Sequence, residues 1–355
     1  MGGRQEVFPP GCKREILPEK AAGELLEKVD VEETPVKAGL KAASLGILMC
    51  LGACASTQEA YVFSSFRGDG EDGLHLAWSA DGYTWTALKG DQSFMLPRVG
   101  GDLMRDPCII RGPDGLYHMV WTTGWWENTI GVAHSADLVT WSEQQEVPVM
   151  AHVPDVMNTW APEIVWLEDS GEYLIFWSSS IPDTFPETAD RGDIRSTVGK
   201  PLNHRIYAVT TKDFRTYSDT FLFYDGGFVS IDASILQEQG RAVMFLKDET
   251  KRPQPEKNIR LAYAETARGP YGDAGAPVSP EGVWVEGPTA MKIGDTYYLY
   301  FDAYMEHRMG AMTSRDLVTW NDISDEISFP AGSRHGSVLK VSRGVIDRII
   351  AATRE

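Results

Sequence analysis

"SADLVTW" occupies residues 135–141 and "SRDLVTW" occupies residues 314–320, so two heptapeptides far apart in the chain differ at one position. A third version, "SADGYTW", stands at 79–85. Self-similar stretches along a chain are typical of repeat architectures, in which each repeat is one supersecondary unit. The fold therefore depends on what surrounds the heptapeptide.

The same pattern precedes each heptapeptide. An apolar run rich in aromatic residues comes first, a polar loop follows, and a second alternating run leads into the heptapeptide, within windows 60–85, 116–141 and 296–320. Short runs rich in Tyr, Trp, Val and Phe, separated by Gly and Asp, are typical of β-strands. Looser copies at 173–217 and 242–271 bring the number of units to five.

A further short strand precedes four of the units, at "DPCIIR", "APEIVW", "DASILQ" and "EGPTAMKI", which begin at 106, 161, 232 and 286. The N-terminal unit lacks this strand, whereas "HGSVLKV" from His335 follows the last unit and lacks a partner. Four-stranded units of roughly 40 to 60 residues are typical of β-propeller blades. We therefore predict an all-β, five-bladed β-propeller over residues 60–355, closed by pairing N-terminal strands 60–88 with the C-terminal strand.

In such a ring the heptapeptide is expected to be the turn between the third and fourth strands of a blade. Its Ser and Asp would bond the local backbone, and its Trp would pack between blades.

The charge balance narrows the range of ligands. Lys and Arg number 33 against 51 Asp and Glu, which gives a net charge of −18. An acidic surface repels phosphate backbones, so nucleic acid is not an expected partner. Neutral ligands such as sugars remain open.

The N-terminal region differs from the repeats. Residues 1–35 carry no motif and are interpreted as a misassigned extension, whereas 36–54 supply two lysines, an apolar run and a small-residue stop, the pattern of a secretory leader. Its end, Leu51 to Cys54, resembles a bacterial lipoprotein cleavage box. This implies lipidation at Cys54, a lipid anchor to the membrane and a periplasmic or cell-surface location. The alternative is a buried apolar helix with an incidental cysteine. In the mature protein only Cys108 would remain a thiol, so no disulfide framework is expected.

Polar residues begin the inner strands, which line the central channel of a propeller. In chain order these residues are Asp106, Glu163, Asp232, Glu286 and His335. Carboxylates that converge on one cavity are costly unless they bind a metal or form a catalytic set. The channel mouth is therefore the predicted site.

Three of these positions carry a family resemblance. "RDPCII", "SIDASIL" and "VEGPTAM", in this order, resemble the catalytic motifs of glycoside hydrolase family 43, five-bladed propellers that remove arabinose, xylose or galactose units by inverting hydrolysis. The resemblance implies Asp106 as general base, Glu286 as general acid and Asp232 as the residue that orients Glu286 and raises its pKa. The family usually has Asp where this chain has Glu163, and often Pro where it has Ala233.

Each acid also has a structural interpretation. Asp106 could cap a loop, Asp232 could anchor a hydrogen bond between blades, and Glu286 could pair with Arg105 or Lys247. For His335 the resemblance implies a place in the channel, where it would help to hold a cation, commonly calcium, through water. The alternative to this cation-binding role is a buried core histidine whose ring nitrogens are hydrogen-bonded within the protein. No cofactor is expected to be required.

Sugar rings have apolar faces, so a binding pocket needs an aromatic platform with polar groups at its edges. The candidates for substrate binding are Trp160, Trp125, Trp126, Arg105, Lys247 and Tyr304, with core packing as the alternative for each tryptophan. The insertions 178–205 and 247–258 each follow a second strand and are expected to rim and narrow the pocket, which favours exo action.

Together these features predict an exo-acting, inverting glycoside hydrolase for terminal α-L-arabinofuranosyl, or related β-xylosyl or galactosyl (including galactofuranosyl), units. A propeller that binds carbohydrate without catalysis and a protein-interaction propeller are the alternatives, since a fold does not determine a function. The β-fructosidases share the five-bladed ring and an "RDP" motif, but the chain lacks the expected "NDPN"-type motif.

Overall fold

The computed structural model describes residues 58–194, 199–238 and 240–354. The predicted extension 1–35, the leader 36–54 and the lipidation site Cys54 lie outside the described residues. Within the described part of the chain no helix has the length and apolar character needed to cross a membrane.

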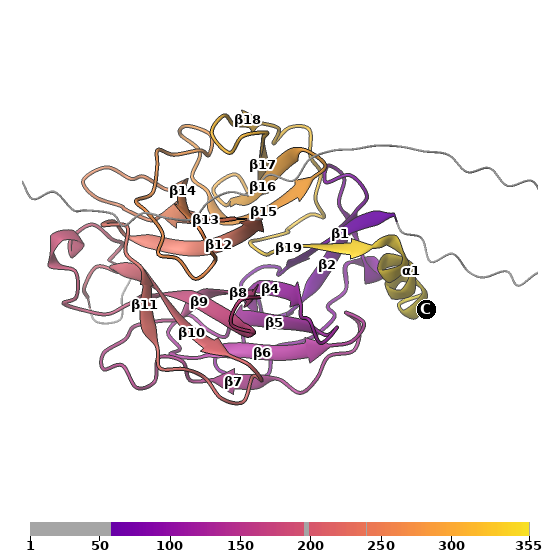
Figure 1. The fold of residues 1–355 in the computed structure, drawn as a ribbon, viewed down its shortest axis with the longest axis horizontal. Helices are drawn as coiled ribbons and strands as arrows, with labels where there is room; N and C mark the ends of the chain where they lie inside the picture. Colours follow the sequence, from indigo (N-terminus) through magenta and orange to yellow (C-terminus); the bar gives the residue numbers. More distant parts are fainter. Residues whose placement is uncertain (1–57, 195–198, 239, 355) are drawn as a thin grey trace, which may run out of the picture. The chain divides into compact units, whose positions relative to one another are not determined.

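Five antiparallel sheets form the described part of the chain (Figure 1). From inner to outer strand, the sheets are β19–β1–β2–β3 (Val338–Ser342, Glu59–Ser65, His75–Ser79, Thr86–Ala87), β4–β5–β6–β7 (Arg105–Arg111, Tyr117–Thr122, Ile130–Ser135, Gln145–Val147), β8–β9–β10–β11 (Trp160–Leu167, Glu172–Ser180, His204–Thr211, Phe221–Tyr224), β12–β13–β14 (Ser230–Glu238, Arg241–Asp248, Asn258–Ala264) and β15–β16–β17–β18 (Glu286–Ile293, Thr296–Ala303, Arg308–Ser314, Asn321–Asp322). The predicted five-bladed β-propeller is confirmed. Two short 3₁₀ segments, Lys89–Asp91 and Pro186–Thr188, and one α-helix, α1 (Arg343–Ala352), complete the described elements.

The core consists of apolar layers between neighbouring blades. One layer joins residues of β1 and β2 to residues of β5, and α1 covers its edge with Val345, Ile346 and Ile349. Close approach within a blade also constrains the sequence, since a Cβ on Gly131 of β6 would lie 2.0 Å from the Trp121 ring of β5. These layers lie between the blades, and the inner strands of the blades line the central channel.

The heptapeptides are turns between third and fourth strands, as predicted. In the 135–141 copy, Asp137 Oδ1 accepts the backbone N–H groups of Val139 and Thr140, and Ser135 Oγ accepts that of Leu138. Residues 79–84, 211–216 and 314–319 repeat these bonds. The packing of Trp between blades is confirmed for Trp85, whose ring lies 5.6 Å from that of Tyr300 in the next blade.

The C-terminal strand closes the ring as predicted, because β19 pairs antiparallel with β1. The regular strand begins at Val338 rather than at His335. The reason lies in Ser64, whose Oγ accepts the Ser337 N–H at 3.2 Å while its own N–H donates to Ser337 O at 3.0 Å. Residues 335–337 therefore follow β1 without a regular ladder.

One blade departs from the predicted four strands. The β12–β13–β14 sheet has three, and the backbone N–H groups that the segment beyond β14 donates to it are those of Gly272, Gly275 and Val278, which bond Tyr263 O, Leu261 O and Ile259 O. These donors are three residues apart, whereas a regular strand presents every second residue to its neighbour. Gly and Pro between 269 and 277 account for the irregular path.

Four inner strands begin with the same distortion. At the start of β4, β8, β12 and β15 the pairing register shifts, and the residue inside the bulge has a positive φ: Asp106 (53°), Ala161 (48°), Asp232 (53°) and Gly287 (60°). A bulge redirects a side chain and often lies next to an active site. Here the bulges lie at the channel mouth.

Candidate active site

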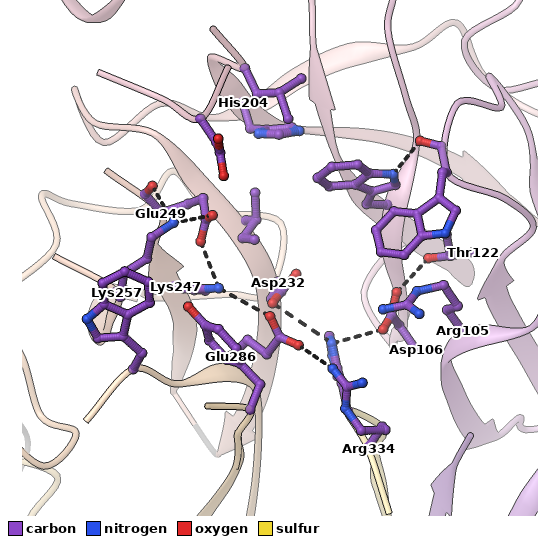
Figure 2. A pocket seen from close by; sticks show the side chains of 18 of the residues that line it. Arg105, Asp106, Thr122, His204, Asp232, Lys247, Glu249, Lys257, Glu286 and Arg334 are labelled. Atoms are coloured by element: carbon purple, nitrogen blue, oxygen red, sulfur yellow. Dashed lines mark hydrogen bonds and ion pairs between the residues drawn. The ribbon is translucent and has the colours of Figure 1, made fainter. Parts of the chain in front are cut away.

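A pocket of about 300 Å³ opens at the channel mouth. It contains nine of the residues singled out from the sequence: Arg105, Asp106, Trp125, Trp160, Asp232, Lys247, Glu286, Tyr304 and His335. Figure 2 shows Lys247 and Glu286 on one side of the pocket, Asp106 and Arg105 on the other, and Asp232 between them. The structure thus brings together in one cavity residues from blades far apart in the sequence.

Asp106 is held from two sides. Thr122 Oγ1 donates to Asp106 Oδ2 at 2.8 Å, and His335 Nδ1 lies 3.2 Å from Asp106 Oδ1. Burial alone would raise the pKa of Asp106, but the charge and hydrogen bond of His335, together with Arg105, lower it to about 2. Asp106 is therefore a carboxylate at neutral pH, and it can accept a proton.

Asp232 has a different environment. Burial raises the pKa of Asp232 to about 6, against the lowering effect of the His335 and Lys247 charges. Its Oδ2 accepts the Gly287 N–H at 3.1 Å, and its own N–H donates to Ser178 Oγ. Asp232 thus joins three blades, in agreement with the interpretation of this residue as an anchor for hydrogen bonds between blades. It also contacts Gly287, the residue that follows Glu286.

Glu286 is held by two cations. Lys247 Nζ lies 3.3 Å from Glu286 Oε2, and Arg334 Nη2 lies 3.1 Å from Oε1. Arg334 Nε in turn donates to Asp302 Oδ2 at 2.6 Å, and Asp302 is buried. The predicted pairing with Lys247 occurs, whereas the alternative partner, Arg105, forms an ion pair with Asp69 at 3.6 Å.

Aromatic side chains line two sides of the pocket. Trp125 and Trp160 contact each other edge to face with ring centres 5.9 Å apart, and the Arg105 guanidinium lies 4.3 Å from the Trp125 ring centre. On the other side Lys247 Nζ lies 4.7 Å from the Tyr304 ring centre. Each of these two cations lies over the face of its ring, so the pocket combines aromatic surface with charged groups. A sugar has both apolar C–H faces and hydroxyl groups, which suit this combination.

Both insertions reach the pocket, as predicted. Residues 178–205 supply Asp193, Leu202 and His204, and residues 247–258 supply Glu249, Lys251 and Lys257. The two insertions contact each other, since the N–H of Lys251 donates to Arg191 O at 2.7 Å. The pocket is therefore walled where the insertions meet.

Sequence reasoning missed several residues of the pocket: Thr122, His204, Lys251, Lys257, Trp284 and Arg334. Arg334 could have been predicted from the sequence, because it directly precedes His335 at the start of the closing segment. The others lie at strand ends or in loops, and no motif marks them.

Two candidate positions lie outside this pocket. Glu163 lies beyond the β8 bulge and does not line this pocket; its Oε2 accepts the Cys108 Sγ–H at 3.0 Å, and both residues line a second cavity of about 400 Å³ further along the inner strands. The residue at the β8 bulge is Ala161, so the equivalence of Glu163 with Asp106 and Asp232 fails. Trp126 does not line the pocket and is 39% exposed, so it is not a core residue.

His335 lies between two carboxylates, with its Nδ1 3.2 Å from Asp106 and 3.9 Å from Asp232. Burial alone would lower the pKa of His335, but these carboxylates raise it to about 9. In the described part of the chain no three His, Cys, Asp or Glu side chains are arranged to hold a metal ion. This donor set does not fit direct coordination of calcium, which prefers six to eight oxygen ligands. A cation held through water remains a prediction.

Comparison with known proteins adds to this geometry. The profile of a family described as a probable glycosyl hydrolase domain, related to glycosyl hydrolase family 43, matches residues 56–347. The chain belongs to this family. The resemblance noted in the sequence is thereby confirmed, and the carboxylates of the pocket lie within the matched region.

Individual relatives are distant. A curated α-L-arabinofuranosidase of Bifidobacterium longum subsp. longum is 22% identical over 309 residues, which cover 74% of this chain and 29% of that protein. The chain thus spans less than a third of that relative's length. Among solved structures, a thermostable family 43 glycoside hydrolase is 18% identical, with 68% of this chain and 80% of that chain covered and a TM-score of 0.49. An α-L-arabinofuranosidase from Lactobacillus brevis is 18% identical, with coverage of 62% and 72% and a TM-score of 0.45.

Proposed function

We propose that this protein is an exo-acting glycosidase that hydrolyses its substrate with inversion and releases terminal α-L-arabinofuranosyl, or related β-xylosyl or galactosyl, units. The observation that carries the proposal is the placement of two carboxyl groups, Asp106 and Glu286, on facing sides of one pocket in different charge environments. Inverting hydrolysis needs such a pair, one as a base and one as an acid.

In this mechanism Asp106 accepts a proton from a water molecule, whose oxygen attacks the anomeric carbon of the terminal sugar. Glu286 gives its proton to the glycosidic oxygen, and the bond between this oxygen and the anomeric carbon breaks. The low pKa of Asp106, about 2, keeps this carboxyl group ionised across the physiological range, which is the state that a base requires. Thr122 and His335 fix both of its oxygens.

Glu286 must carry a proton when the substrate binds, and Asp232 is proposed to support it. The Asp232 carboxylate bonds the backbone N–H of Gly287, so it fixes the segment that holds Glu286. Lys247 and Arg334 hold the two oxygens of Glu286 in place.

Exo action is supported by the size of the pocket and by its walls. A volume of about 300 Å³ is at the lower end of the range of small-molecule sites, about 300–1,000 Å³. The two insertions meet at its rim through Lys251 and Arg191. Such a pocket suits a chain end or a side group better than the interior of a long polysaccharide.

The first experiment is release of 4-nitrophenol by the full chain from a panel of α-L-arabinofuranosides, β-xylosides, galactosides and galactofuranosides. We expect one glycoside to be turned over, and Asp106→Asn and Glu286→Gln to reduce kcat by about 10²–10⁴ each, since this is the usual contribution of a general base or acid. NMR of the first product formed should show the inverted anomer. Turnover by both variants at the wild-type rate would contradict the assignment.

The folded protein could bind sugar measurably yet release no product from the panel or from arabinan, xylan and galactan. This result would favour the non-catalytic carbohydrate-binding propeller. A calcium ion held through water near His335 is tested by thermal unfolding of the protein before and after dialysis against a chelator. We expect lower thermal stability after dialysis, and recovery on addition of calcium.

Export and lipidation are proposed from the sequence alone. We propose that residues 36–54 are removed in part and that Cys54 is acylated, which would anchor the protein at a membrane surface. Incorporation of labelled palmitate into the wild type, and its loss in Cys54→Ser, would support this. Equal labelling of both proteins would rule out Cys54 as the lipidated residue.

A further inference from the structure

Five Lys and Arg side chains line the pocket, and four of them have a carboxylate partner within 4.0 Å. These four cations form six ion pairs: Arg105 with Asp69, Lys247 with Glu249 and Glu286, Lys257 with Glu249, and Arg334 with Glu286 and Asp302. Lys251 is the exception. Among the residues that the structure describes, no carboxylate pairs with its ammonium group.

Lys251 is held in the pocket by other means. Its backbone N–H is bonded to Arg191 O, and its Nζ lies 4.2 Å from the ring centre of Trp284. A cation over an indole face is stabilised by the electrons of the ring. An ammonium group has three N–H donors, so contact with one ring face leaves donors for a ligand.

The charge around Lys251 is not neutralised locally. Glu249, the nearest acid along the chain, already lies between Lys247 and Lys257. This is unusual for the chain as a whole, which has 51 acidic and 33 basic side chains. An unpaired, partly buried cation in an otherwise acidic protein creates a local site for an anion.

Lys251 lies on the side of the pocket that carries Glu286. Trp284 is two residues before Glu286, and Lys247, which contacts Glu286, is four residues before Lys251. Figure 2 shows Lys247, Glu249 and Lys257 on this side and Asp106 on the opposite side. A general acid contacts the leaving-group oxygen, so in the proposed function this is the side on which the leaving sugar binds.

We propose that Lys251 binds an anionic group, a carboxylate or a sulfate ester, on the sugar at the leaving-group side of the pocket. The substrates would then be acidic oligosaccharides or polysaccharides that carry the released unit next to a charged sugar. This inference rests on the proposed function, because the role of Glu286 defines the leaving-group side. It narrows the proposed substrates to acidic carbohydrates.

The test is binding, measured by isothermal titration or ligand-observed NMR on the full chain. The probes are D-glucuronate, D-galacturonate and D-glucose 6-sulfate, with D-glucose and D-galactose as neutral counterparts. We expect the wild type to bind at least one anionic probe about tenfold more tightly than its neutral counterpart, the size expected of a charge-assisted hydrogen bond. This preference should decrease as salt rises.

Variants locate the preference. Lys251→Met and Lys251→Gln should abolish it, and Lys251→Arg, which keeps the charge, should retain most of it. Lys212→Met is the matched control, because it removes one charge from a side chain that is 66% exposed and lies outside the pocket. It should keep the preference, which excludes an effect of net charge alone.

The outcomes separate the two proposals. Equal affinity for charged and neutral probes, or a preference that survives in both neutral variants, would overturn the anion site. Preference for the sulfate alone, or for the uronates alone, would support the site and identify the anion. Turnover of aryl glycosides without any anion preference would overturn this inference and leave the hydrolase proposal intact. An anion preference without turnover of any glycan would support the anion site at Lys251 and overturn the hydrolase proposal, and with it the assignment of this site to the leaving-group side.

Discussion

Thr122 shows how one hydroxyl can serve both the fold and the site. Its Oγ1 donates to Asp106 Oδ2 and accepts the Ala161 N–H at 2.7 Å, so it joins two blades at the base of the pocket. We expect Thr122→Val to leave Asp106 Oδ2 and the Ala161 N–H without this hydroxyl partner, to destabilise the protein by about 1–3 kcal/mol and to reduce kcat. Urea unfolding and the 4-nitrophenol assay measure the two effects. Thr122→Ser, which keeps the hydroxyl, is the control; a stable and fully active valine variant would contradict the role.

Glu163 predicts a dependence of stability on pH. Burial raises its pKa from an ordinary 4.5 to about 7. Between these values the unfolded chain loses a proton that the folded chain keeps, so Glu163 makes stability fall as pH rises, with the full cost present above about pH 7. We expect Glu163→Gln to remove this loss and to be more stable than the wild type at pH 8, by up to about 3 kcal/mol.

Urea unfolding at pH 4.5, 6 and 8 tests this prediction. The exposed Glu168→Gln, on the same blade, is the control and should keep the wild-type slope. An unchanged slope in Glu163→Gln would show that the carboxyl is not the source of the pH dependence.

Among single residues, the sequence predicted the pocket location of those that belong to motifs. Asp106, Asp232 and Glu286 could be located because each begins a repeated strand, and repeats can be aligned within one chain. The insertion that carries Lys251 was predicted to rim the pocket, but the residue within it that enters the pocket was not, and Trp284 was not predicted at all, because only the folded chain determines how these loops are placed. Glu163 was misplaced because the bulge shifts which residue of each inner strand faces the pocket.

Among the elements, the heptapeptide turn has the clearest energetic role. Its Asp satisfies two backbone N–H groups in each of four blades, and the next residue has a positive φ, which is 66° at Leu138. Left-handed backbone is costly for a residue with a Cβ, so the Asp bonds and the burial of Leu138 must compensate. The sequence showed the repeat but not this strain.

We expect Asp137→Ala to destabilise the protein by about 1–2 kcal/mol, because the N–H groups of Val139 and Thr140 lose their acceptor. Chemical unfolding of the variant measures this loss. Asp137→Asn keeps an acceptor oxygen at the same position and should retain most of the stability. Equal stability of Asp137→Ala and the wild type would show that solvent replaces the carboxylate without cost.

On the scale of the whole molecule, the pairing of β19 with β1 closes the ring. We expect a chain that ends at Ala331 to lose cooperative folding, because it leaves the inner edge of β1 unpaired and removes Val345, Ile346 and Ile349 from the core. A chain that ends at Thr353 is the control, since it keeps β19 and α1. Circular dichroism during thermal unfolding distinguishes them, and a sharp transition in the shorter chain would contradict the prediction.

The ring closure was predictable because the first unit lacked its inner strand and the C-terminal segment supplied a strand without a partner. The three-stranded blade was not predictable, because its outer segment departs from the ladder through the local geometry of Gly and Pro.

The closing segment also gives the protein a built-in order of assembly. Arg334 and His335 contact Glu286 and Asp106, and both precede β19 directly, near the end of the chain. A ribosome therefore delivers these two cations after every carboxylate of the pocket, and they reach the pocket only when the last strand docks. During synthesis the unfinished propeller holds its pocket acids without two of their counter-charges, so maturation of the pocket and closure of the ring coincide in a single late event.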